Sequence, residues 1–193
     1  MTFTWIAFLH YSQGFDRSIS ILFIVTDSAM IPLRRKDMTM PLEIIHGDIT
    51  QIPADAIVNA ANPQLQMGGG VCGAIFRAAG PKALQAACDK LAPIQTGQAV
   101  ITPAFALPAT YVIHTPGPVY SRQSPQESEN LLVSCYRSCL TLAAEYGCRS
   151  IAFPLISSGI YGYPYQQALD TAIQTIQAFL KHHDMDVRLV LFD

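Results

Sequence analysis

The stretch over residues 56–80, AIVNAANPQLQMGGGVCGAIFRAAG, constrains the fold more than any other part of the sequence. It begins with an apolar run at 56–58 that is typical of a buried strand. A polar turn containing Asn59 and Asn62 follows, and three glycines at 68–70 precede a predicted helix. Unpaired backbone amides at a helix N-terminus bind anions, and glycines let a ligand approach the backbone closely. The stretch therefore predicts a cradle for a phosphorylated ligand.

Composition excludes several other classes of protein. Half of the 193 residues are hydrophobic and 13% are charged, which favours one globular domain over a disordered chain. The net charge of -2 gives no electrostatic footprint for general nucleic-acid binding. Five cysteines without a CxxC pair argue against a disulfide scaffold and a zinc site, so we expect no metal, no cofactor and a cytoplasmic location.

Residues 1–40 differ in composition from the remainder of the chain. Their two apolar runs are shorter than the ~18 residues expected of a membrane span, and no basic region precedes them. We interpret 1–40 as a poorly packed N-terminal extension and 41–193 as the domain. Two alternatives are a natural start at Met38 or Met40 and a weak association of this segment with membranes.

Strands and helices alternate along the domain. Strands are predicted at 42–45, 56–59, 98–102, 111–115, 150–154 and 187–192, and helices at 71–79, 81–90, 125–146 and 164–182. Such alternation predicts an α/β fold with a largely parallel sheet, in which ligands bind beyond the carboxyl ends of the strands. Asp48, the turn at 59–70 and the loop at 157–162 all follow strands and are expected at that edge.

Two loops have alternative interpretations. Residues 68–73 match GxGxxG, but the glycines follow the strand end by several residues and no acidic residue ends a strand about 20 positions later. A dinucleotide-binding Rossmann turn is therefore disfavoured, whereas a flexible surface loop stays open. The loop at 157–162 either embraces a diphosphate with its amides and hydroxyls or is a plain turn before the next helix.

Five separated motifs, VNAANPQL, MGGGVCGAIFRAAG, TGQAVIT, YVIHTPGP and ISSGIYGYP, together resemble a macrodomain. The resemblance covers residues 42–193 and is strongest to the MacroD-type branch, which includes bacterial proteins acting on O-acetyl-ADP-ribose. It implies a three-layer α/β/α sandwich with a mixed, largely parallel sheet and a cleft for ADP-ribose.

The resemblance also implies roles for individual residues. Asp48, Ile49 and Phe192 would contact adenine. Asn62, supported by Asn59, would contact the distal ribose, and Gly69, Gly70 and Val71 would contact the ribose and diphosphate. The phosphates would be contacted by Ser157, Ser158, Gly159, Ile160 and Tyr161. Without the resemblance, the aspartate is equally explained as a cap, the asparagines as turn residues and the phenylalanine as a core aromatic.

Two features depart from the pattern of the family. Cys72 stands where MacroD-type hydrolases usually carry an aspartate that orients water, and Phe76 where they often carry histidine. Asn59, Asn62 and Cys72 are the candidate catalytic residues, although a small residue tolerated in the cleft is the simpler interpretation of Cys72. The chain stops at Asp193, where relatives usually continue into another helix. His114 lies in an apolar strand and is expected to be structural.

We therefore expect binding of ADP-ribose and hydrolysis of its esters. The reactions would be deacetylation of O-acetyl-ADP-ribose and removal of mono-ADP-ribose from acidic side chains. The expected partners are ADP-ribose, O-acetyl-ADP-ribose and mono-ADP-ribosylated proteins, and the expected state is a monomer. A non-catalytic ADP-ribose reader and a regulator acting through protein contacts are the alternatives.

Overall fold

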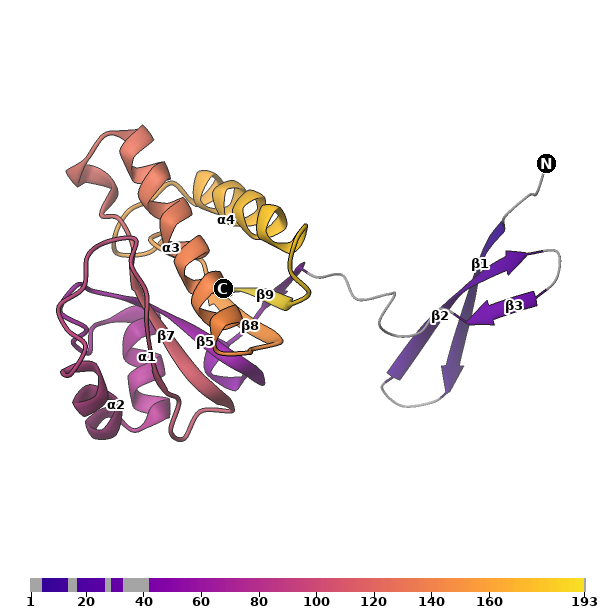
Figure 1. Cartoon of the computed structure of the whole chain (residues 1–193), viewed down its shortest axis with the longest axis horizontal. Helices are drawn as coiled ribbons and strands as arrows, with labels where there is room; N and C mark the ends of the chain where they lie inside the picture. Colours follow the sequence, from indigo (N-terminus) through magenta and orange to yellow (C-terminus); the bar gives the residue numbers. More distant parts are fainter. Residues whose placement is uncertain (1–4, 14–16, 27–28, 33–41, 193) are drawn as a thin grey trace. The chain divides into compact units, whose positions relative to one another are not determined.

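The computed structural model describes residues 5–13, 17–26, 29–32 and 42–192, and the chain divides into two compact units, Met1–Met40 and Pro41–Asp193 (Figure 1). In the first unit, β1 (Trp5–Gln13), β2 (Arg17–Thr26) and β3 (Ala29–Pro32) form an antiparallel sheet in the order β1-β2-β3. Its interpretation as a poorly packed extension stays a prediction, and the alternative starts at Met38 and Met40 lie outside the described residues.

The second unit is built on a six-stranded sheet with the order β4-β9-β8-β5-β7-β6. The strands are β4 (Leu42–His46), β5 (Ala54–Ala61), β6 (Val100–Pro103), β7 (Ala109–Pro116), β8 (Ser150–Pro154) and β9 (Asp186–Leu191). Only the pairing of β6 with β7 is antiparallel in this sheet. The expectation of a mixed, largely parallel sheet is confirmed.

Helices cover both faces of this sheet. In Figure 1, α1 (Gly70–Ala79) and α2 (Pro81–Cys88) lie on one side, and α3 (Pro125–Glu145) and α4 (Tyr165–Leu180) lie on the other. Two 3-10 helices, η2 (Ile49–Gln51) and η3 (Tyr120–Arg122), complete the unit. The expected three-layer α/β/α sandwich is therefore present. Among the described residues, no helix combines the length and apolarity needed to span a bilayer.

The apolar run in β5 explains why the layers form. Successive side chains of a strand point to opposite faces, so Ala56 and Val58 pack with the α3/α4 layer while Ile57 packs with the α1/α2 layer. All three residues are 0% exposed. A strand buried on both faces reads as a near-continuous apolar run, and the polar residues of β5 lie toward its two ends. The functional groups of such a fold are consequently pushed to the strand ends.

Local signals set several element boundaries as predicted. Pro81 begins α2, the Ser124 hydroxyl accepts a hydrogen bond from the Glu127 amide at 3.2 Å to cap α3, and Gly147 (φ 72°) follows the C-terminus of α3. The end of the last strand differs from the prediction in a way that matters for the site. β9 ends at Leu191, so Phe192 lies beyond the strand and is 87% exposed. The alternative of a core aromatic at this position is wrong.

Candidate functional site

The carboxyl ends of five parallel strands lie in a row along one edge of the sheet. In spatial order these ends carry Asp48 after β4, Phe192 after β9, the loop at 155–163 after β8, Asn62 after β5 and Gly117 after β7. Four gaps between neighbouring strands span roughly 20 Å. The edge therefore suits an extended ligand, with each part of it facing a different strand end.

A cavity of about 280 Å³ lies over the β8, β5 and β7 end of this row. Its walls include the predicted residues Asn62, Gly69, Gly70, Val71, Cys72, Ser157, Gly159, Ile160 and Tyr161, together with Ala60, Ala61, Gly68, Gly117 and Leu155. The structure thus brings together two segments that are about 90 residues apart in the sequence. The predicted residues Asp48, Ile49, Asn59, Ser158 and Phe192 lie outside this cavity.

The first wall is the glycine run at the N-terminus of α1. Gly70 takes a left-handed conformation (φ 57°), which favours glycine. A Cβ atom on Gly73 would lie 2.5 Å from the Gly68 carbonyl oxygen, so the loop packs directly against the first turn of the helix. The backbone amides at 68–70 donate to no acceptor within the described residues. Together with the helix dipole, these amides present a positive potential to the cavity.

The second wall is the loop at 155–163. It is closed by hydrogen bonds from the Ser158 hydroxyl to the Leu155 carbonyl (2.9 Å) and from the Tyr163 amide to the Ser157 carbonyl (3.0 Å). The four amides at 158–161 have no acceptor in the part of the chain that the structure describes. Ser157 has a left-handed backbone (φ 66°), and its hydroxyl is buried without a partner among the described residues. Such strain concentrates at sites that bind ligands.

The two walls meet at the mouth of the cavity. A Cβ atom on Gly69 would lie 3.5 Å from the Ile160 Cδ1 atom, which is ordinary van der Waals contact. The Ile160 side chain is nevertheless 84% exposed. An exposed aliphatic side chain that reaches the opposite wall narrows the opening between the two loops.

Asn62 closes its own turn at the end of β5. Its Nδ2 donates to the Gln66 carbonyl (2.7 Å), and its Oδ1 accepts from the Gln66 amide (3.1 Å). The amide retains one further hydrogen and one lone pair, since an asparagine side chain can make about four hydrogen bonds. Asn62 can therefore fix the loop and contact a ligand at the same time.

Asn59 lies behind the cavity instead of on its wall, so the structure does not support the predicted catalytic role. It is 1% exposed, and its Nδ2 lies 3.0 Å from His114 Nδ1. An amide Nδ2 only donates, so His114 Nε2 carries the proton and donates to Thr102 Oγ1 at 2.9 Å. Burial lowers the pKa of His114 to about 4, which keeps the ring neutral. His114 is structural, as expected, and supports the strand that leads to Asn62.

Cys72 is one of two titratable side chains on the cavity wall, with Tyr161 the other. The thiol is 5% exposed and lies 3.9 Å from the Gln66 carbonyl oxygen. Burial raises the pKa of Tyr161, so its hydroxyl stays protonated at neutral pH. Among the described residues, no carboxylate or imidazole lines the cavity and no group of side chains is arranged to hold a metal ion.

Asp48 and Phe192 form a separate part of the same edge. The Gly47 amide donates to the Leu191 carbonyl at 3.0 Å, which places the ends of β4 and β9 side by side. One carboxylate oxygen of Asp48 caps η2 by accepting from the Thr50 amide (2.9 Å) and hydroxyl (2.8 Å). The other oxygen and the Ile49 amide have no partner within the described residues. The aspartate is thus a cap that retains a free acceptor.

Sequence reasoning missed Gly117 and Leu155 on the cavity wall. Gly117 lies between two prolines directly after β7, and a Cβ atom there would clash with Ser157 Oγ and lie 2.6 Å from Ile156 Cγ2. The signal was available, because this glycine also follows the end of a parallel strand. Leu155 carries no distinguishing feature in the sequence.

Comparisons with known proteins agree with this arrangement. A family model described as Macro domain matches residues 58–172. An O-acetyl-ADP-ribose deacetylase of Salmonella gallinarum is 52% identical over 162 residues, covering 81% of this chain and 89% of that protein.

Solved structures are similar as well. The Oceanobacillus iheyensis macrodomain with ADP has a TM-score of 0.75 and 46% identity, covering 79% of this chain and 83% of that chain. The Trypanosoma brucei macrodomain in complex with ADP-ribose has a TM-score of 0.71 and 41% identity, covering 78% and 63% of the two chains. With the match to the family model and the similarity over most of its length, this chain belongs to the macrodomain family.

Proposed function

We propose that the protein binds ADP-ribose along the strand-end row and hydrolyses esters of ADP-ribose. The observation that carries the proposal is the pair of loops whose unpaired amides, at 68–70 and 158–161, border one cavity. Two opposed rows of backbone donors suit a diphosphate. The Salmonella gallinarum deacetylase and the macrodomain structures with ADP and ADP-ribose support the same ligand class.

The order of the strand ends suggests where the adenine and the distal ribose of the ligand lie. With the diphosphate between the loops, the adenine lies toward Asp48 and Phe192, where a free carboxylate oxygen accepts from its amino group. The distal ribose lies toward Asn62 and Gly70. The ester bond is then held near Cys72, at the closed end of the glycine wall.

Catalysis in this cleft depends more on the positioning of the ester and the water than on a general base of the protein. A water molecule attacks the acyl carbon, the bond from that carbon to the ribose oxygen breaks, and a carboxylic acid and ADP-ribose are released. No described carboxylate or imidazole lines the cavity, so the water is oriented by the ligand phosphates and the fixed loops. The substrates would be O-acetyl-ADP-ribose and mono-ADP-ribosylated acidic side chains of proteins.

The test combines calorimetry with ADP-ribose and incubation with O-acetyl-ADP-ribose and a glutamate-ADP-ribosylated protein. We expect saturable binding and turnover above buffer on at least one substrate. Binding without turnover on either substrate would refute the hydrolase and favour a reader module. The absence of binding would refute both.

The reader is the second candidate because no described carboxylate or imidazole lines the cavity. Replacement of Cys72 by aspartate and by serine separates the two functions. If the native cleft is catalytic, Cys72→Asp and Cys72→Ser both retain turnover within about 10-fold of the native protein, since positioning supplies the rate. Large activity in Cys72→Asp alone would identify the native protein as a reader.

A further inference from the structure

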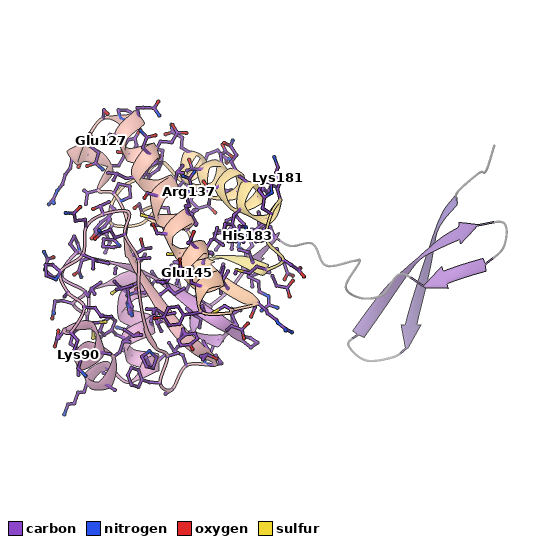
Figure 2. All side chains as sticks on the ribbon, in the orientation of Figure 1. Lys90, Glu127, Arg137, Glu145, Lys181 and His183 are labelled. Carbon is purple, nitrogen blue, oxygen red and sulfur yellow. The ribbon has the colours of Figure 1, made fainter. Side chains whose placement is uncertain are left out.

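A second hollow of the domain lies between α3 and α4 and shares no lining residue with the strand-end cavity. It has a volume of about 760 Å³ and is lined by Val133, Arg137, Thr141, Ala144 and Glu145 of α3, Gln174, Thr175, Ala178 and Phe179 of α4, and His182 and His183 just beyond it. We call it the α3/α4 groove. Figure 2 shows Arg137 and Glu145 along α3, with His183 beside them.

The α3 side of this groove carries a charge pattern that complements itself. Arg137, Thr141 and Glu145 are spaced by four residues, so they form one ridge with steps of about 6 Å. If two copies of this ridge run antiparallel and face each other at Thr141, Arg137 of each copy lies opposite Glu145 of the other. Within the described residues, neither Arg137 nor Glu145 makes an ion pair or a side-chain hydrogen bond, and both are exposed.

The remaining groove residues permit close approach of another helix. Thr141, Ala144 and Ala178 are small, and Val133 and Phe179 are partly buried apolar side chains on either side of them. The His183 ring stacks on Phe179 with 3.8 Å between ring centroids and covers one end. The helices are 21 and 16 residues long and offer a face of roughly 30 by 20 Å. That size is of the order of the about 800 Å² that each partner buries in a stable interface.

We propose that the α3/α4 groove receives α3 of a second copy of this chain in a two-fold symmetric dimer. The symmetry axis passes near Thr141, and Arg137 of each copy pairs with Glu145 of the other. Such an interface is isologous, because the same ridge serves both partners. The groove shares no lining residue with the strand-end cavity, and the dimer departs from the monomer expected from the sequence.

Charge reversal tests the pairing directly, with sedimentation velocity of the full chain over the micromolar range. We expect the native chain to dimerise, and Arg137→Glu or Glu145→Arg alone to raise the dimer dissociation constant at least ~10-fold, since each places like charges together twice. A mixture of the two variants, or the double variant Arg137→Glu/Glu145→Arg, restores the dimer. A native chain that stays monomeric, or an assembly that survives both single reversals, overturns the proposal.

A cross-link tests the position of the axis. Because a residue on a two-fold axis faces its own copy, Thr141→Cys should form a disulfide-linked dimer under mild oxidation. Gln126→Cys is the matched control, as an exposed position on the same helix four turns away. Equal cross-linking of the two variants contradicts the proposed register. We expect ADP-ribose binding to be unchanged in all groove variants, because the groove shares no residue with the cavity. Failure of this proposal is therefore distinguishable from failure of the proposed function.

Discussion

The strand-end cavity and the α3/α4 groove are built in opposite ways. The strand-end cavity is small, about 280 Å³, and its walls are largely backbone held in left-handed or tightly packed conformations. The α3/α4 groove is larger, about 760 Å³, and its walls are side chains on two regular helices. Unpaired backbone amides converge on the strand-end cavity. In the α3/α4 groove, the amides and carbonyls of the helices are instead used within the helices. Convergent unsatisfied donors, more than volume, identify the site for a small anionic ligand.

The first test of this comparison removes His114, which is buried behind the strand-end cavity. His114→Leu leaves the Asn59 amide and the Thr102 hydroxyl without partners in the core. Two unsatisfied buried groups cost about 3 kcal/mol together, which we expect as a loss in the free energy of unfolding by urea. Arg137→Glu in the α3/α4 groove, measured at low protein concentration, should change it by less than about 0.5 kcal/mol. Equal losses in the free energy of unfolding for His114→Leu and Arg137→Glu would contradict this difference between the two hollows.

The same histidine predicts a pH dependence. Its pKa is about 4 in the folded protein against an ordinary value of 6.5, so only the unfolded chain binds a proton between these pH values. The contribution of His114 to stability is therefore complete above pH 6.5 and falls by about 3 kcal/mol as the pH approaches 4. Urea unfolding at several pH values measures it. His114→Gln, which cannot titrate, should show a correspondingly flatter profile, and parallel profiles would refute the assignment.

Gly117→Ala adds a methyl group to the wall of the strand-end cavity. The added methyl group would clash with Ser157 Oγ and Ile156 Cγ2, and would push the loop at 155–163 outward. Overpacking of this kind costs about 1–3 kcal/mol, and we expect a fall in ADP-ribose affinity by calorimetry alongside the lost stability. Gly147→Ala is the control for glycine replacement, because its Cβ meets no atom within 4 Å although its φ of 72° is strained. Unchanged affinity in Gly117→Ala would show that the loop does not bind the ligand.

The smallest expected effect separates the two tasks of Asn62. Asn62→Asp keeps an acceptor for the Gln66 amide but loses the donor to the Gln66 carbonyl, whereas Asn62→Ala loses both. We expect ADP-ribose affinity to fall about 10-fold in Asn62→Ala, equivalent to ~1.4 kcal/mol, with Asn62→Asp between this variant and the native protein. Calorimetry measures the order. An alanine variant that binds like the native protein would remove Asn62 from the site.

Sequence periodicity predicted most of the fold because its signals are local. The apolar run at 56–58, the proline at the start of α2 and the glycine after α3 each specify an element through its own backbone and burial. The glycine wall was predicted for the same reason, since strand, turn and helix start are contiguous. The sheet of β1, β2 and β3 was not predicted, because polar residues interrupt its apolar runs.

The roles of the two asparagines show what the sequence left open. Asn59 and Asn62 lie in one polar segment, and the sequence placed both at the site. β5 continues to Ala61, so Asn59 still belongs to the strand and turns toward His114, while Asn62 lies beyond it and reaches the cavity. Strand length depends on pairing with β7, which contributes residues more than 50 positions away.

The sequence by itself determined the layers, the glycine loop before α1 and the family, because periodicity and motif order are properties of the chain. Only the tertiary structure decided which asparagine faces the cavity, that Gly117 lines the cavity and that Phe192 is exposed. It also placed the α3 ridge of Arg137, Thr141 and Glu145 beside α4, so that the two helices line one groove. These outcomes depend on distances between segments remote in sequence, and no local pattern encodes such distances.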